Sequence, residues 1–276
     1  MSHAGAPVGG LLVLVDPVAR RLDGESVRIA KDVLSAGAAA KICLPDSQEE
    51  FARALARRGH RRPVIVGDDR ALVRTVGLLH RERRLAEATL ALVPVGPAGS
   101  LGLARSLGVP LSAVTAARAV LDGGVRLCDL LVDDSDGVVL GALRIAPVRA
   151  PSRPAGPSVW SAYRSLVRTL VRPTPSAAAT GHRLRVEADG ELLADVDRPV
   201  QDVAVTTHED GGLAEVMVRT GDGAVRIRAK TVTVSGTDFR YRADAAMAGP
   251  VRRRTWTLHP SAWSLALPHQ PGPIDT

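Results

Sequence analysis

The turn from Gly67 to Ala71 places residues that could bind a phosphate between a strand and a helix. It follows the apolar run Pro63 to Gly67 and precedes a helical pattern. A glycine at such a turn leaves the backbone amides bare, so the amides and the helix dipole can reach an anion. Asp68 and Asp69 follow the glycine, and a carboxylate beside a triphosphate repels it unless a divalent cation intervenes. The turn is therefore either a phosphate site or a polar turn in which an aspartate caps the helix.

The elements that position this turn alternate along the first half of the chain. Apolar runs predict buried strands at Leu11 to Asp16, Ala39 to Leu44, Pro63 to Gly67 and Thr89 to Val95. Amphipathic stretches predict helices at Glu25 to Ala36, Ser47 to Gly59 and Ala71 to Leu85. Alternating strands and helices indicate a mostly parallel sheet covered on both faces. We predict an α/β domain of the Rossmann-like type over residues 8–127.

The second half of the chain changes to a period of two. Apolar and charged residues alternate in the segments Leu184 to Glu187, Val225 to Lys230 and Phe239 to Arg242. Half-buried strands separated by Asp-Gly turns indicate antiparallel pairing. We predict a mainly antiparallel β-sandwich over residues 128–257, with residues 258–270 returning to complete the first domain. Between the two halves, proline-rich stretches bracket a short helical pattern around Trp160.

Composition and charge exclude several classes of protein. No stretch is long and apolar enough to span a bilayer, and the first apolar run lacks the basic residues of a signal peptide. Cys43 and Cys128 lie in apolar runs without a paired spacing, which predicts small core residues in a reducing cytoplasm. The net charge of +7 comes mainly from arginine, which either codon use or an anionic partner explains. Basic clusters at residues 57–62 and 252–254 suit an anionic membrane surface, with a solvated basic face as the alternative.

The order of the elements and several landmarks resembles bacterial diacylglycerol kinases, whose catalytic domain is similar to that of NAD kinases. The resemblance spans residues 11–268. An Asn-Pro pair follows the first strand in that family, and Asp16 and Pro17 stand here. Of the family's Gly-Gly-Asp-Gly-Thr loop after the third strand, only Gly67 and Asp69 remain. A later loop, Pro94 to Pro110, keeps the family's two ends but has lost the Thr, Asn and Asp of its middle.

The resemblance implies an ATP-dependent kinase that phosphorylates a lipid hydroxyl in a cleft between the two domains. It assigns nucleotide binding to Gly67, Asp69 and Gly96, and it makes Asp210 the candidate residue of a metal-binding turn. It makes Asp244 the general base, because attack on a γ-phosphate needs an oriented acceptor for the hydroxyl proton. The Gly and Glu that follow this aspartate in the family are both replaced by alanine here.

Two functions therefore remain open at the level of the sequence. One is an active diacylglycerol kinase-like enzyme with ATP and Mg²⁺ as cofactors. The other is a catalytically inactive relative that keeps the scaffold to bind a lipid, a nucleotide or a protein partner, and the altered loops favour it. We expect a lipid at a membrane surface as the partner and no nucleic acid, because no nucleic-acid-binding module appears. The expected location is the cytoplasm, and both a homodimer and peripheral association with a membrane are left open.

Overall fold

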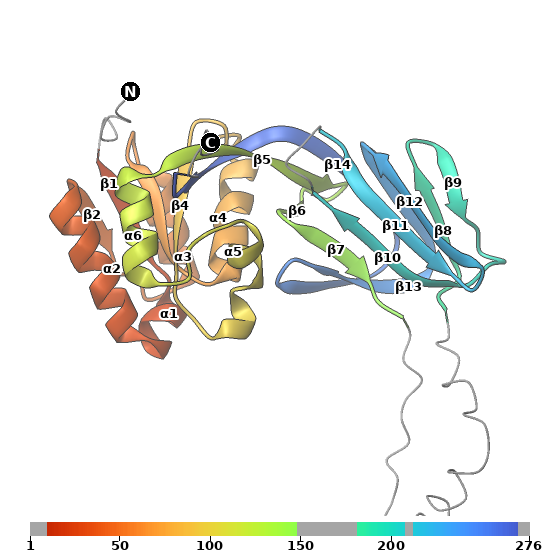
Figure 1. Cartoon of the computed structure of the whole chain (residues 1–276), viewed down its shortest axis with the longest axis horizontal. Helices are drawn as coiled ribbons and strands as arrows, with labels where there is room; N and C mark the ends of the chain where they lie inside the picture. The colour runs from red at the N-terminus through yellow and green to blue at the C-terminus, as the bar shows by residue number, and fades with distance from the viewer. Residues whose placement is uncertain (1–9, 148–180, 208–211, 270–276) are drawn as a thin grey trace, which may run out of the picture.

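The computed structural model describes residues 10–147, 181–207 and 212–269, which form an α/β half and a β-rich half (Figure 1). The first half contains β1 (Leu11–Val15), α1 (Pro17–Leu22), α2 (Gly24–Gly37), β2 (Ala40–Cys43), α3 (Gln48–Ala56), β3 (Arg62–Gly67), α4 (Asp69–Arg81), β4 (Thr89–Pro94), the 3-10 turn η1 (Ala98–Ser100), α5 (Gly102–Ser106) and α6 (Ala113–Asp122). The second contains β5 (Gly124–Asp133), β6 (Val138–Val139), β7 (Ala142–Ile145), β8 (Leu184–Ala188), β9 (Glu191–Ala194), β10 (Val200–Thr206), β11 (Ala214–Thr220), β12 (Gly223–Ala229), β13 (Thr231–Ala243) and β14 (Ala246–Leu267). The predicted fold class is confirmed.

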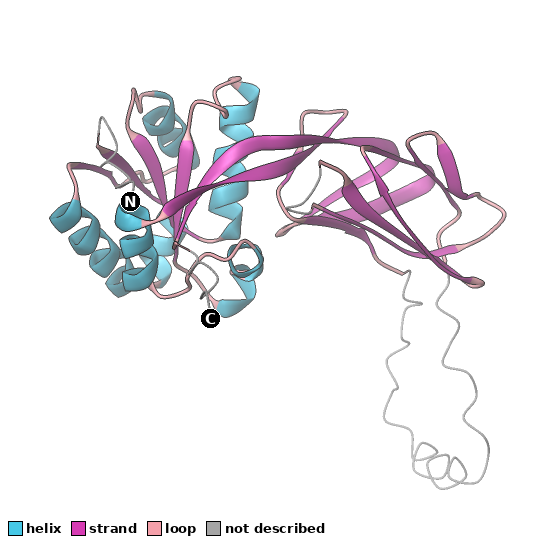
Figure 2. Ribbon diagram, turned by 45° about the horizontal axis from the view of Figure 1, so that its top comes forward, coloured by secondary structure: helices cyan, strands magenta, loops and turns pink. Residues whose placement is uncertain are grey.

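The α/β half is a parallel sheet with helices on both faces. Its strand order is β2-β1-β3-β4, and every neighbouring pair is parallel. Because side chains alternate along a strand, Val13 packs with α2 and α6 on one face while Leu14 packs with α3 and α4 on the other. Figure 2 shows the helices flanking these strands. In a parallel sheet all the carboxyl ends lie at one edge, so the turns after β1, β3 and β4 come together there.

Two long strands join the halves into one continuous sheet. The 22-residue strand β14 pairs antiparallel with β5 and β13 and then parallel with β4, where Ser264 lies opposite Thr89. Figure 1 shows β5 and β14 crossing together from one half to the other. The C-terminal part of β14 therefore extends the parallel sheet of the first half.

The β-rich half is built from strands whose apolar residues face a shared core. Val186, Val234 and Trp256 are fully buried in this core, whereas Arg240 and Arg242, which flank buried Tyr241, are exposed. The period of two thus gives the correct face for most strands. The exception is β12, where Val225 is 45% exposed. This strand lies at the end of the strand order and, among the described strands, pairs with β11 alone.

Several helix boundaries differ from those that the sequence predicts. Helix α3 ends at Ala56 rather than near Gly59, although Ser47 caps its start as expected by accepting a hydrogen bond from the amide of Glu50 (3.2 Å). The sequence pattern missed α1, which begins directly after Asp16 with a proline in its first turn. The helical pattern around Trp160 lies outside the described residues.

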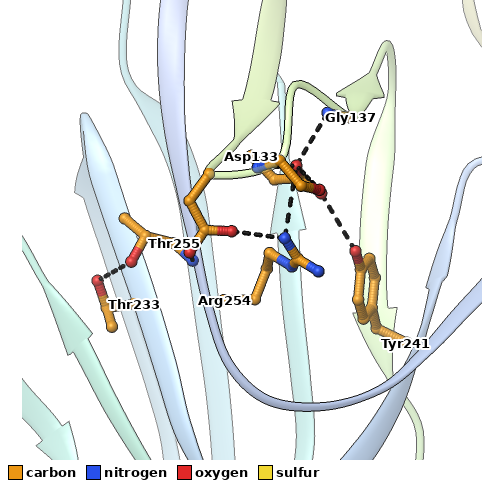
Figure 3. Close-up of polar contacts among 8 residues, drawn as sticks. Asp133, Gly137, Thr233, Tyr241, Arg254 and Thr255 are labelled. Atoms are coloured by element: carbon orange, nitrogen blue, oxygen red, sulfur yellow. Dashed lines mark hydrogen bonds and ion pairs between the residues drawn. The ribbon is translucent and has the colours of Figure 1, made fainter.

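A partly buried polar cluster fastens the turn after β5 to the two longest strands (Figure 3). Asp133 accepts hydrogen bonds from the amides of Ser135 and Gly137, both at 2.8 Å, and from the hydroxyl of Tyr241 at 3.3 Å. The guanidinium of Arg254 lies 3.8 Å from the same carboxylate. Burial alone would raise the pKa of Asp133, but the hydrogen bonds from Ser135 and Gly137, aided by Arg254, lower it below 3.8.

Replacing Asp133 with asparagine is expected to destabilise the fold in a pH-dependent way. Asparagine keeps the shape but loses the charge. A lowered pKa in the folded state means that the charge stabilises the fold above the ordinary value of 3.8 and that this contribution is lost as the pH falls through the folded pKa. Urea unfolding should therefore give Asp133→Asn a lower free energy of unfolding than the wild type at neutral pH. The difference between the two proteins should shrink as the pH falls into the acid range.

A matched control lies in the same turn. Asp136 is exposed and has φ +61°, a conformation that asparagine tolerates, so Asp136→Asn should follow the wild-type pH profile. A constant loss for Asp133→Asn at every pH would contradict the electrostatic explanation.

Candidate functional site

A cavity of about 1040 Å³ lies where the α/β half meets the β-rich half. The turns after β3 and β4 line it from one side, and β7 with the turn between β13 and β14 lines it from the other. Of the residues predicted from the sequence, Asp69 and Asp244 line this cavity, whereas Gly67 and Gly96 are not among its lining residues. Asp210 lies outside the described residues. The cavity thus brings together two carboxylates that are far apart in the sequence.

Packing requires the two predicted glycines. Gly67 ends β3 in the core, and a Cβ there would lie 3.0 Å from the Cβ atoms of both Asp16 and Ala71. Gly96 has φ +154°, and a Cβ there would lie 2.9 Å from the Oγ of Ser100. Both glycines therefore allow close approach of chain segments, and their predicted contacts with a nucleotide stay predictions.

Three helices that begin at the carboxyl edge of the sheet are capped by the chain's own carboxylates. Asp16 accepts a hydrogen bond from the amide of Val18 at the start of α1 (2.7 Å). Asp68 accepts one from the amide of Ala71 at the start of α4 (3.1 Å). These acceptors satisfy amides that would otherwise be free to bind an external anion. Asp69 does the same for α5.

Asp69 connects two helices through a buried carboxylate. It is the first residue of α4, and its two oxygens accept hydrogen bonds from the amides of Leu103 (2.8 Å) and Ala104 (2.9 Å) at the start of α5. The residue is 3% exposed. Burial raises the pKa of Asp69, and the neighbouring charge of Asp68 raises it further. The hydrogen bonds from the amides lower the pKa, but the net shift is upward from the ordinary value. The carboxylate therefore acts first as an internal helix cap.

Asp244 fixes the other wall of the cavity. Its carboxylate accepts hydrogen bonds from the amides of Leu140 (2.7 Å), Gly141 (2.9 Å) and Ala142 (3.0 Å). These bonds tie the turn between β13 and β14 to the start of β7. Burial raises the pKa of Asp244, and the charge of Asp69 raises it further. The hydrogen bonds from the three amides lower the pKa, but the net shift is upward. The aspartate predicted to be a base thus also holds two strands together.

Among the described residues that line the cavity, the formal charges cancel. The basic residues are Arg70, Arg126, Arg144 and Arg242, and the acidic ones are Asp68, Asp69, Asp129 and Asp244. Arg144 is engaged by Asp202 through two hydrogen bonds (2.7 and 3.0 Å), and Arg242 donates to the backbone carbonyl of Asp244 (3.0 Å). The cavity therefore offers no excess of positive charge to a ligand as negative as a triphosphate.

Sequence reasoning missed part of this lining. Arg126 and Arg144 both line the cavity, but strand periodicity says only which face of a strand they occupy. Asp129 also lines the cavity and accepts a hydrogen bond from the amide of Ser261 (2.8 Å) through one oxygen. Its other oxygen is buried and has no hydrogen-bond partner among the described residues.

Two further properties concern metals and membranes. Within the described ranges, no three His, Cys, Asp or Glu side chains come together in a way that could hold a metal ion. None of the helices in the same part of the chain has the length and apolarity needed to cross a membrane.

Solved structures provide the comparison that relates this architecture to known proteins. A diacylglycerol kinase from Bacillus anthracis str. Sterne superimposes with a TM-score of 0.70 at 15% identity, covering 93% of this chain and 96% of that one. An NAD kinase from Archaeoglobus fulgidus, solved in complex with ATP, gives a TM-score of 0.52 at 12% identity, covering 93% and 92%. No protein-family model and no curated protein sequence matches the chain. The chain has the two-domain fold shared by diacylglycerol kinases and NAD kinases.

Proposed function

We propose that the protein binds an amphipathic lipid in the cavity between its two halves without transferring a phosphate to it. The observation that carries this proposal is the capping of α1, α4 and α5 by Asp16, Asp68 and Asp69. The chain's own carboxylates thus engage amides at helix N-termini, which are the groups that can bind a phosphate. The protein then keeps the scaffold of a kinase and uses its cavity for binding.

The residues at the helix ends do not fit a triphosphate. Asp68 and Asp69 place two carboxylates at the turn after β3, and like charges in a partly buried site repel strongly. A phosphate there would have to displace Asp68 from its hydrogen bond with Ala71. The balanced charges of the lining do not compensate for that displacement. We therefore assign no step of phosphoryl transfer to this site.

The remaining lining suits a lipid. Its larger apolar residues, among those described, are Val18, Leu22, Pro97, Leu103, Leu107 and Leu140. Val18 and Leu22 are 41% and 63% exposed, although both are large and apolar. Exposed apolar residues next to a cavity are typical of a site that an apolar ligand covers. Arg70 and Arg126 add cationic groups that can receive the polar head of a lipid delivered from a membrane surface.

A variant of the lining tests the proposal. Leu22→Arg is expected to lower the affinity for diacylglycerol about tenfold or more, because it places a charge where an acyl chain would lie. Binding is measured by the transfer of tritiated diacylglycerol from phosphatidylcholine vesicles to the protein, separated by size exclusion. Leu192→Arg is the matched control, since Leu192 is 46% exposed on β9 and does not line the cavity. Equal binding by the wild type and Leu22→Arg would refute the assignment of the lipid to this cavity.

An ATP-dependent lipid kinase is the second candidate, and the position of Asp244 favours it. This carboxylate lines the cavity, and burial raises its pKa above the ordinary value, which makes it a stronger base. Incubation with labelled ATP, Mg²⁺ and mixed lipid vesicles distinguishes the two functions. Labelled lipid above the level of an Asp244→Asn control would favour the kinase, and lipid binding without label would favour the proposal.

The homodimer left open by the sequence stays a prediction.

A further inference from the structure

A second cavity, of about 490 Å³, lies at the opposite edge of the parallel sheet. It is lined by the segment between α3 and β3 and by the segment before β4, including Arg58, Arg62 and Thr89. Strand β3 begins at Arg62 beside this cavity and ends at Gly67 beside the first one. At about 3.3 Å per residue, the two sites are separated by roughly the length of that strand, or about 17 Å.

Arg58 provides a buried cation in this second cavity. The residue is 3% exposed, which is rare for an arginine. One terminal nitrogen donates to the carbonyl of Gly59 and the other to the carbonyl of Arg84, both at 3.2 Å. Its Nε is buried and meets no hydrogen-bond acceptor among the described residues. A buried donor without an acceptor costs stability, so the fold holds this cation in place at a cost.

The other charges lining the cavity are mostly positive. Arg61, Arg62 and Arg84 line it with Arg58, and Glu87 is the one acid among the described residues that line it. Glu87 lies 3.7 Å from Arg58 and 3.8 Å from Arg84. Arg84 is held in place because it also donates to the carbonyl of Ala56 (3.2 Å). Backbone carbonyls therefore hold the guanidinium groups of Arg58 and Arg84. The four arginines that line the cavity still exceed the charge of Glu87 and of Glu82, which lies 3.8 Å from Arg84.

Bringing like charges together in a partly buried cavity costs free energy unless an anion compensates them. The guanidinium fork matches the oxygens of a phosphate group and binds it with two parallel hydrogen bonds. Gly59, at φ +60°, has open space where a Cβ would stand, so the backbone beside Arg58 leaves room for a ligand. Carboxylate ligands would offer fewer acceptors and less charge to four arginines.

We propose that this cavity is a phosphate-binding site, in which Arg58, Arg61 and Arg84 hold a phosphate group. The site is distinct from the cavity between the halves and does not depend on its function. The phosphate can belong to a small phosphorylated compound in solution or to the headgroup of an anionic lipid.

Calorimetric titration of the full chain with pyrophosphate, at constant ionic strength, tests the site. Arg61 is exposed, so Arg61→Ser should leave the fold intact while lowering the affinity about tenfold. Arg58→Lys should lower it further, because lysine keeps the charge but lacks the fork. Arg228→Ser is the matched control, since Arg228 is an exposed arginine on β12 in the other half. Thermal melting of each variant shows whether it is folded.

A second arm identifies the source of the phosphate. Sedimentation with phosphatidylcholine vesicles, with and without phosphatidic acid, is compared for the same variants. Saturable pyrophosphate binding that Arg61→Ser weakens and Arg228→Ser does not would support a soluble ligand. Binding to phosphatidic acid alone with the same pattern of variants would support a lipid headgroup. Equal losses for Arg61→Ser and Arg228→Ser, or no binding in either arm, would overturn the proposal.

Discussion

Replacing Asp69 with alanine is expected to lower the free energy of unfolding by about 2 kcal/mol. The amides of Leu103 and Ala104 would lose their acceptor inside the protein, and α5 would lose the cap that attaches it to α4. Because burial raises the pKa of Asp69, its charge itself costs some stability at neutral pH, and losing that charge offsets part of the effect. Urea unfolding monitored by circular dichroism measures the difference.

Asp122→Ala provides the control for this experiment. Asp122 is an exposed aspartate at the end of α6, and we expect its replacement to change the stability by less than about 0.5 kcal/mol. If Asp69→Ala were as stable as Asp122→Ala, the carboxylate would not be acting as a buried cap. Asp69 would then be free to bind a cofactor, as the resemblance to the kinases implies.

Replacing Asp244 with glycine is expected to cost about 2 kcal/mol of stability and to abolish lipid binding in the cavity. Three amides would lose their shared acceptor, so the start of β7 would no longer be held against the turn between β13 and β14. Glycine is the appropriate replacement because Asp244 has φ +45°, at which alanine would add strain of its own. The measurements are urea unfolding and the transfer of tritiated diacylglycerol.

Asp189→Gly is the matched control for Asp244→Gly, because both aspartates have a positive φ and accept hydrogen bonds from backbone amides. Asp189 has φ +48° and accepts hydrogen bonds from the amides of Lys230 (2.9 Å) and Thr231 (2.7 Å), but it lies in an exposed hairpin away from the cavity. We expect a smaller loss of stability and unchanged lipid binding. A catalytic aspartate without a structural role would give the opposite result for Asp244→Gly, with stability retained and only activity lost.

The fold could be predicted from the sequence because its two halves have different periods. Buried runs such as Leu11 to Val15 alternate with helical stretches, and beyond residue 181 strands such as β8 alternate at every second residue. Local patterns fail where tertiary position decides. Val225 follows the strand pattern but is exposed on an edge strand, and α1 is too short for its period to be recognised.

The candidate site could be predicted only in part. Asp69 and Asp244 were identified as chemically relevant, and both line the cavity. Their hydrogen-bond partners could not be foreseen, because Leu103 lies 34 residues from Asp69 and Leu140 lies 104 residues from Asp244. A sequence shows that a carboxylate is present at a turn, but not which amides the fold brings to it. That information decides whether a phosphate site is open or already filled by the chain.

Calorimetric titration of the wild-type protein with ATP and Mg²⁺ tests the central claim most directly. Because Asp68 and Asp69 already cap the helices at the turn after β3, we predict no saturable heat up to concentrations of about 1 mM. A parallel titration with a short-chain diacylglycerol should give saturable binding. Binding of ATP with a dissociation constant in the micromolar range would contradict the account, because the carboxylates would then not exclude the triphosphate.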